Sequence, residues 1–188
     1  IHASVARCGA ITKQLLSFAR HMDFSFQPLD LEKIIREVIG FLGREAEYRN
    51  IKISVNVSEE IPQFESDRGK LQQVFLNLLN NAFAALADGG NLDISAVLLK
   101  DERIRITVED NGCGIPEKDF KKIFEPFFST RTNVGGTGLG LSITYSLIQE
   151  VGGTVDVNST VDVGTRFIIT LPLNAKKIKE KDNAIAPR

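Results

Sequence analysis

Trp, Tyr and Cys are scarce in this sequence, which has no Trp, two Tyr and two Cys among 188 residues, although it has 12 Phe. Proteins that bind single-stranded nucleic acids stack the bases on aromatic side chains, so the scarcity of Trp and Tyr argues against such a partner. The two cysteines, Cys8 and Cys113, form no CxxC pair, so we expect a reducing compartment and no metal or redox motif. No apolar run reaches the roughly 18 residues of a membrane span, and no signal peptide is visible.

Neither sign of charge dominates the chain. Lys and Arg number 23 against 24 Asp and Glu, a net charge of −1, which excludes a global basic field for nucleic acid or acidic lipid. The hydrophobic fraction of 43% and the charged fraction of 25% are typical of globular proteins. Since the first residue is Ile1 rather than Met, we expect a piece of a longer protein, whose other parts could include a membrane anchor.

Hydrophobic periodicity divides the chain into helices and strands. Helices are predicted where apolar residues recur every three or four positions, with Asp30 and Asp67 as N-caps, and strands where they alternate. The predicted helices are 1–22, 30–50, 67 to the turn at 88–91, 118–124 and 139–151. The predicted strands are 51–57, 92–99, 104–109, 154–158 and 165–171. The expected fold class is α+β: an α/β sandwich with helices on one face of a mixed, mostly antiparallel sheet, preceded by one long helix.

The first predicted helix carries a narrow apolar stripe with close to the 3.5-residue spacing of helices that pack side by side. The stripe comprises Ile1, Val5, Cys8, Thr12, Leu15, Phe18 and Met22. Because so short a helix is marginal alone, it needs a partner. That partner is either its own domain or another helix of a dimerising hairpin, and the pattern favours neither. At the other end, residues 174–188 are polar and basic, and we expect them to be disordered.

Two glycine clusters are the most informative local features. The first, Asp110-Asn111-Gly112-Cys113-Gly114-Ile115, follows a predicted strand, and the second, Gly135-Gly136-Thr137-Gly138-Leu139-Gly140-Leu141, precedes a predicted helix. Glycines let the backbone approach phosphate oxygens, and a helix N-terminus supplies N–H groups and partial positive charge. The second cluster has Leu141 where a Walker A loop requires Lys, and the first lacks the third glycine of the dinucleotide fingerprint. Neither common phosphate motif is therefore present.

Five segments together resemble, in order and spacing, the sequence boxes of sensor histidine kinases. They are Asn77-Leu78-Leu79-Asn80-Asn81-Ala82 (N box), Asp110-x-Gly112-x-Gly114 (G1), Phe124-Glu125-Pro126-Phe127-Phe128 (F), Gly136-Thr137-Gly138-Leu139-Gly140-Leu141 (G2) and Gly164-Thr165-Arg166-Phe167. The stretch from Arg7 to Arg20 is similar to the second helix of that family's dimerisation hairpin. The resemblance covers residues 1–173 and implies an incomplete hairpin in 1–24 and a Bergerat-type ATP-binding catalytic domain in 27–173, followed by the basic tail in 174–188.

The resemblance also implies roles for individual residues toward ATP and Mg²⁺. Asp110 would accept a hydrogen bond from the adenine amino group, and Asn81 would bind Mg²⁺ through its amide oxygen. Asn77, one turn earlier on the same helix face, would act around the phosphates. Residues 125–140 would form a lid in which Arg131 meets the charge that develops on the phosphate. Asn77 and Arg131 are thus the implied catalytic residues.

The implied nucleotide contacts extend over all five boxes. They are Asn77, Asn81, Asp110, Gly112, Gly114, Ile115, Phe128, Ser129, Thr130, Arg131, Gly136, Thr137, Gly138, Leu139, Gly140, Leu141 and Thr165. Ala84 stands where some relatives carry Lys, so that phosphate contact is missing here.

Asn77 separates subclasses of this fold. Relatives that hydrolyse ATP, such as gyrase-type and mismatch-repair ATPases, carry Glu at this position as a general base for water. An amide takes no proton at neutral pH, so Asn77 favours transfer of the γ-phosphoryl group to a histidine. The alternatives are an ATP-hydrolysing Bergerat ATPase and a degenerate module that binds nucleotide but only dimerises or scaffolds, against which the intact boxes argue.

The resemblance implies a cytoplasmic kinase that phosphorylates a histidine outside this chain and passes the phosphoryl group to an aspartate of a response-regulator receiver domain. The intact protein would be a homodimer through the helical hairpin, with no nucleic-acid partner and no membrane contact from this part. The family's acceptor lies in a His-Glu-type motif on the first hairpin helix. Here His2 precedes Ala3 and His21 precedes Met22, so neither is an implied acceptor.

A chain with the nucleotide boxes but without an acceptor helix is expected to bind ATP and not to label itself. Phosphoryl transfer requires an acceptor in line with the γ-phosphate, and neither His2 nor His21 is expected there. Incubation with γ-labelled ATP, followed by acid-stability analysis, is the measurement. Acid-labile label on either histidine, at a rate comparable with an intact kinase, would contradict the assignment of the first helix.

Overall fold

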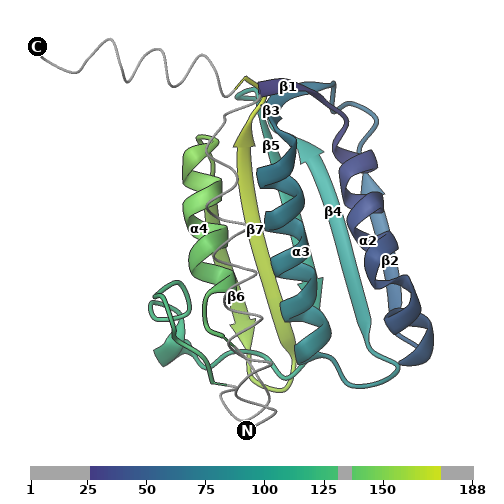
Figure 1. Ribbon diagram of the computed structural model, residues 1–188, viewed down its shortest axis with the longest axis vertical. Coiled ribbons are helices and arrows are strands. Elements are labelled where there is room, and N and C mark those ends of the chain that lie inside the picture. The colour runs from purple at the N-terminus through teal and green to yellow at the C-terminus, as the bar shows by residue number, and fades with distance from the viewer. Residues whose placement is uncertain (1–25, 131–136, 175–188) are drawn as a thin grey trace, which may run out of the picture.

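Three helices lie side by side over one face of a five-stranded sheet (Figure 1) in the computed structural model, which describes residues 26–130 and 137–174. The helices are α2 (Leu31–Tyr48), α3 (Arg68–Ala85) and α4 (Gly140–Glu150). The strands of the sheet are β2 (Lys52–Val57), β4 (Asn91–Leu98), β5 (Arg103–Asp110), β6 (Thr154–Thr160) and β7 (Gly164–Pro172). The predicted α/β sandwich is confirmed. The predicted helix 1–22, both histidines, Arg131, Gly136 and nearly all of the tail lie outside the described residues.

The sheet has the strand order β2-β4-β5-β7-β6. Neighbouring strands run antiparallel except β2 and β4, which are parallel with Ile53 opposite Leu92. Parallel neighbours need a crossover, which here runs through α3, whereas β4–β5 and β6–β7 are hairpins. The pairing of β5 with β7 then joins the two hairpins into one sheet, with Asp110 opposite Thr165.

Both long helices begin at the aspartates predicted to cap them. The Asp30 carboxylate accepts a hydrogen bond from the Lys33 N–H at 3.1 Å, and the Asp67 carboxylate accepts one from the Lys70 N–H at 3.0 Å. Each bond satisfies one of the N–H groups that a helix start leaves without a partner. After α2 the chain turns at Asn50, which has a left-handed φ of 52°.

The core lies between the helices and the sheet. Along β4, Leu92, Ile94 and Ala96 are buried under the helices, while the residues between them are exposed on the opposite face. Helix α3 lies in the middle, between α2 and α4, and nine of its residues are buried: Lys70, Leu71, Val74, Phe75, Asn77, Leu78, Leu79, Ala82 and Phe83. The position of α3 therefore fixes the helical layer.

Two short elements differ from the sequence prediction. Strands β1 (Phe26–Leu29) and β3 (Phe64–Asp67) pair antiparallel beside the start of α3, and neither was predicted. Four residues are too few to show periodicity, and β1 contains Pro28, a residue that is tolerated only in strands at a sheet edge. The predicted helix 118–124 was wrong in length, because only a 3₁₀ turn at Glu117–Asp119 forms, followed by further turns.

Truncating the centre of α3 tests its role in the core. Leu79 is fully buried, so Leu79→Ala is expected to lower the free energy of unfolding by about 2–5 kcal/mol. Val97→Ala, on the open face of β4 where the side chain is 47% exposed, is the matched control and is expected to change it by about 0.5 kcal/mol or less. Denaturant midpoints measure both, and equal losses would contradict the assignment of the core to the helical face.

Candidate functional site

A cavity of about 830 Å³ lies where α3, the start of α4 and the loop after β5 meet. It falls within the size range of small-molecule sites. The residues of the predicted site that line it are Asn77, Asn81, Asp110, Gly114, Ile115, Phe128, Ser129, Thr130, Thr137, Gly138, Gly140, Leu141 and Thr165. The fold thus brings the separate sequence boxes to one cavity.

Asp110 is the last residue of β5, and its carboxylate is held at the end of the strand. It is buried, and its Oδ1 accepts a hydrogen bond from the Gly112 N–H at 2.8 Å. Thr165, opposite it on β7, lies with its Oγ1 at 3.0 Å from the Ser159 hydroxyl, which in turn accepts the Ile115 N–H at 2.8 Å. A buried carboxylate at a cavity wall can accept a hydrogen bond from the edge of a planar ring.

Gly112 is not among the residues that line the cavity, and its expected contact with a ligand stays a prediction. A Cβ at this position would lie 2.7 Å from the carbonyl carbon and oxygen of Ala85, at the end of α3. The next residue, Cys113, donates its N–H to the same Ala85 carbonyl at 3.2 Å. The glycine therefore allows the loop after β5 to pack closely on the end of α3.

Among the described residues, a single buried polar side-chain atom lacks a hydrogen-bond partner, and it belongs to Asn81. That atom, Nδ2, belongs to an amide whose oxygen and nitrogen exchange places by a half-turn, so either can face the cavity. The described residues include no cluster of three or more His, Cys, Asp or Glu that could hold a metal alone. Mg²⁺ takes oxygen ligands, keeps several waters and is often completed by substrate phosphates, so the amide oxygen of Asn81 fits this ion as a single protein ligand.

Asn77 borders the cavity, but its amide is engaged within the protein. Its Nδ2 donates to the Gly140 carbonyl at 3.0 Å and to the Thr144 hydroxyl at 3.3 Å, while its Oδ1 accepts from Gln73 Nε2 at 2.9 Å. Both amide hydrogens are thereby used. The side chain connects the middle of α3 to the first turn of α4, and it offers no donor to a phosphate in this arrangement.

The N-terminus of α4 faces the cavity without a side-chain cap. Its N-cap residue, Leu139, is buried and not on the wall, and it makes no capping hydrogen bond with its side chain. Just before it, Gly138 has a φ of +69° and packs against the backbone of Phe127, whose own φ is +66°. The backbone N–H groups of the first turn remain suited to an anion, as expected at a helix start.

The cavity also has wall residues that were not predicted: Glu45, Arg49, Asn80, Ala84, Ala85, Cys113, Pro116, Ile123 and Phe167. Asn80 and Cys113 lie inside the quoted boxes and could have been included on that ground. Glu45 and Arg49 belong to α2, and nothing in their local sequence links them to the boxes. Within residues 26–130 and 137–174, no helix combines the length and apolar composition needed to cross a bilayer.

Comparisons with known proteins agree with this geometry. Residues 66–175 match the family of histidine kinase-, DNA gyrase B- and HSP90-like ATPases. Sporulation kinase E of Bacillus subtilis is 32% identical over 173 residues, which are 92% of this chain and 23% of that protein. The solved catalytic domain of histidine kinase ThkA is 33% identical with a TM-score of 0.73, covering 83% of this chain and 99% of that one.

A further solved structure holds ThkA in complex with the response regulator protein TrrA. There the matched chain is 29% identical with a TM-score of 0.77, over 93% of this chain and 49% of that one. The chain spans 23% and 28% of the lengths of the first two curated relatives, the sporulation kinases E and A of Bacillus subtilis. The similarity therefore concerns one part of those longer proteins.

Gly140 offers a test of the cavity that leaves the fold intact. A Cβ at this position would lie 4.0 Å from both Asn77 Cγ and Asn81 Nδ2, so it meets no clash but projects toward the two amides. Gly140→Ala is expected to keep or raise stability, by up to about 1 kcal/mol, and to weaken binding of a Mg·ATP analogue roughly tenfold. Thermal unfolding and titration calorimetry measure the two effects.

Gly40→Ala, in α2, is the matched control, because a Cβ there meets nothing within 4 Å. It should give a similar change in helix stability without a change in affinity. Unaltered affinity in Gly140→Ala would place the ligand away from α4.

Proposed function

The chain belongs to the histidine kinase-, DNA gyrase B- and HSP90-like ATPase family, and on that premise we propose that its cavity binds Mg·ATP for transfer of the γ-phosphoryl group to a histidine. The observation that carries the proposal is the convergence of Asp110, Asn81 and the α4 N-terminus on one cavity. These three features offer an acceptor for a base edge, an amide for a cation and N–H groups for phosphates. ATP use follows from the family, whereas Mg²⁺ and the transfer step are the proposal.

Each part of the cavity has a distinct task in this mechanism. The Asp110 carboxylate, oriented by the Gly112 N–H, accepts a hydrogen bond from the adenine amino group. The N–H groups at the start of α4 bind phosphate oxygens, and Asn77 holds that helix start by its bond to the Gly140 carbonyl. Asn81 would hold Mg²⁺, which when bound neutralises charge on the phosphates. Arg131, the predicted lid cation, lies outside the described residues.

The carboxylates on the cavity wall favour transfer over hydrolysis. Of the described residues that line the cavity, Asp110 and Glu45 carry carboxylates. Asp110 is bound to the Gly112 N–H, and Glu45 lies on α2 beside Arg49. A general base for water must reach the attacking oxygen, and the residue one turn before Asn81 is the amide Asn77. We therefore infer that the phosphoryl acceptor is a side chain supplied from outside the described residues.

The proposal extends to the whole protein of which this chain resembles one part. We infer a cytoplasmic kinase that dimerises through a helical hairpin and passes its phosphoryl group to a response-regulator receiver domain. The similarity to sporulation kinase E supports the kinase activity, and the similarity to ThkA, which is solved in complex with a response regulator, supports the partner.

Removing the Asp110 carboxylate tests the adenine contact. Asp110→Ala is expected to weaken ATP roughly ten- to over a hundredfold, because a hydrogen bond to a charged group contributes about 1.5–3 kcal/mol. Asp156→Ala, at an exposed position of β6, is the matched control and should bind as the unchanged chain does. Titration calorimetry is the measurement, and unchanged affinity in a folded Asp110→Ala chain would remove Asp110 from the site.

Transfer and hydrolysis are separated by a phosphotransfer assay on a longer protein that includes a His-Glu acceptor helix. Acid-labile label on that helix with little steady-state phosphate release supports the proposed kinase. Rapid phosphate release without label would instead support an ATPase, and nucleotide binding with neither would support a scaffold.

A further inference from the structure

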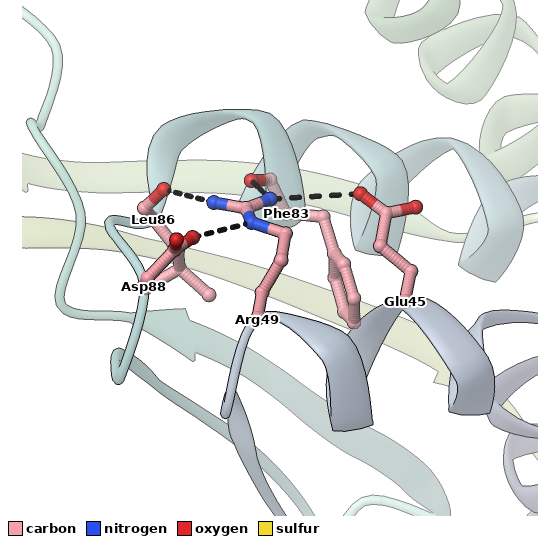
Figure 2. Close-up of polar contacts among 5 residues, drawn as sticks. All are labelled: Glu45, Arg49, Phe83, Leu86 and Asp88. Atoms are coloured by element: carbon pink, nitrogen blue, oxygen red, sulfur yellow. Dashed lines mark hydrogen bonds and ion pairs between the residues drawn. The ribbon is translucent and has the colours of Figure 1, made fainter.

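Arg49, the C-cap residue of α2, bridges to the end of α3 and the turn that follows it (Figure 2). Its Nη1 donates to the Phe83 carbonyl at 2.8 Å, and its Nη2 donates to the Leu86 carbonyl at 2.6 Å. Its Nε donates to Asp88 Oδ1 at 2.9 Å, and Glu45, one turn earlier on α2, lies 3.5 Å from Nη1. One planar guanidinium thus contacts four groups.

The Arg49 guanidinium supplies hydrogen-bond donors to carbonyl groups at the C-terminus of α3. The last carbonyls of a helix have no partner inside the helix and carry partial negative charge. Helix α3 has no basic residue in its own last turn, so the cation comes from α2. Arginine is always charged in proteins, and the hydrogen bond to Asp88, together with the carboxylate of Glu45, raises the pKa of Arg49 further. The backbone of Arg49 contacts the same turn, because its carbonyl accepts a hydrogen bond from the Gly89 N–H at 2.8 Å.

The last turn of α3, which Arg49 contacts, also forms part of the cavity wall. Ala84 and Ala85 line the wall, and so does Arg49 itself. On its other side, the Ala85 carbonyl accepts the Cys113 N–H, and Gly112 packs directly on that carbonyl. A displacement of the last turn of α3 would therefore move the loop that follows Asp110.

We propose that Arg49 is a positioning residue of the nucleotide site, acting through the last turn of α3 on the loop that follows Asp110. This inference rests on the proposed function. It adds to the site Arg49, which caps α2, a helix that contains none of the sequence boxes. Arg49 fixes the distance between the wall formed by α3 and the wall formed by residues 110–115. Lysine cannot replace it, because a single ammonium group cannot reproduce the planar fork that bonds two carbonyls and a carboxylate together.

The test compares substitutions in the 188-residue chain. Arg49→Ala removes all contacts of the guanidinium, Arg49→Lys keeps the charge without the fork, and Asp88→Ala removes one partner while the two carbonyl bonds remain. Arg36→Ala is the matched control, because it removes an arginine of α2 whose ion pair with Glu32 is exposed and lies at the far end of the helix. Affinity for a Mg·ATP analogue is measured by calorimetry, and amide hydrogen exchange is followed without nucleotide.

Arg49→Ala and Arg49→Lys are expected to weaken the analogue roughly tenfold or more, with a smaller loss in Asp88→Ala and none in Arg36→Ala. Exchange at the Cys113 amide, which bonds to Ala85, should accelerate in both Arg49 variants, while exchange at Ile169 in the core of β7 stays slow. A residue that only stabilised the fold would change the two amides together and leave the affinity of the folded fraction unaltered.

Affinity within about twofold of the unchanged chain in Arg49→Lys, or an unchanged exchange rate at Cys113, would overturn this inference alone. If Arg49→Ala does not fold, Arg49→Lys and Asp88→Ala decide by the same two measurements. Absence of analogue binding by the unchanged chain would overturn the proposed function and this inference with it.

Discussion

Helix α3 has to serve the core and the cavity along the same 18 residues, and most other features of the structure follow from that constraint. Its buried face packs on the sheet, and its flanks pack on α2 and α4. The residues left over at its C-terminal half, among them Asn81 and Ala84, are those that reach the cavity. A helix with two such tasks cannot shift or rotate without cost, because any movement that helps the site disturbs close-packed side chains.

Polar contacts fix how the neighbouring helices sit against α3. Lys70 is almost fully buried and pairs with Glu150 at the end of α4, while Asn77 bonds to Gly140 at its start. On the other side, Glu37 of α2 accepts bonds from Arg68 and Gln72. Apolar packing alone tolerates small slides between helices, whereas directional bonds at both ends allow one register. The start of α4 is thereby held where its N–H groups meet the cavity.

Much of this arrangement could be predicted from the sequence. The caps at Asp30 and Asp67, the five strands of the sheet and the one-sided helical layer all follow from local patterns, and the structure confirms them. The predicted set of site residues came from motif order rather than from spacing in three dimensions, and its roles stay predictions. What local patterns could not give are contacts between distant elements: the bridge from Arg49 to α3, the engagement of the Asn77 amide and the packing of Gly112 on Ala85. Each depends on how elements meet in space, and no periodicity encodes that.

The long connection from β5 to α4 is anchored at both ends by rigid parts of the fold. Asp110 is paired with Leu92 and Thr165 in the sheet, and Gly140 is tied to α3 through Asn77. Because the entropic cost of closing a loop rises only logarithmically, doubling such a connection costs about 0.6 kcal/mol. Loop closure therefore sets only a weak limit on the length of this connection, while the sheet and α3 hold the two walls that it joins in register.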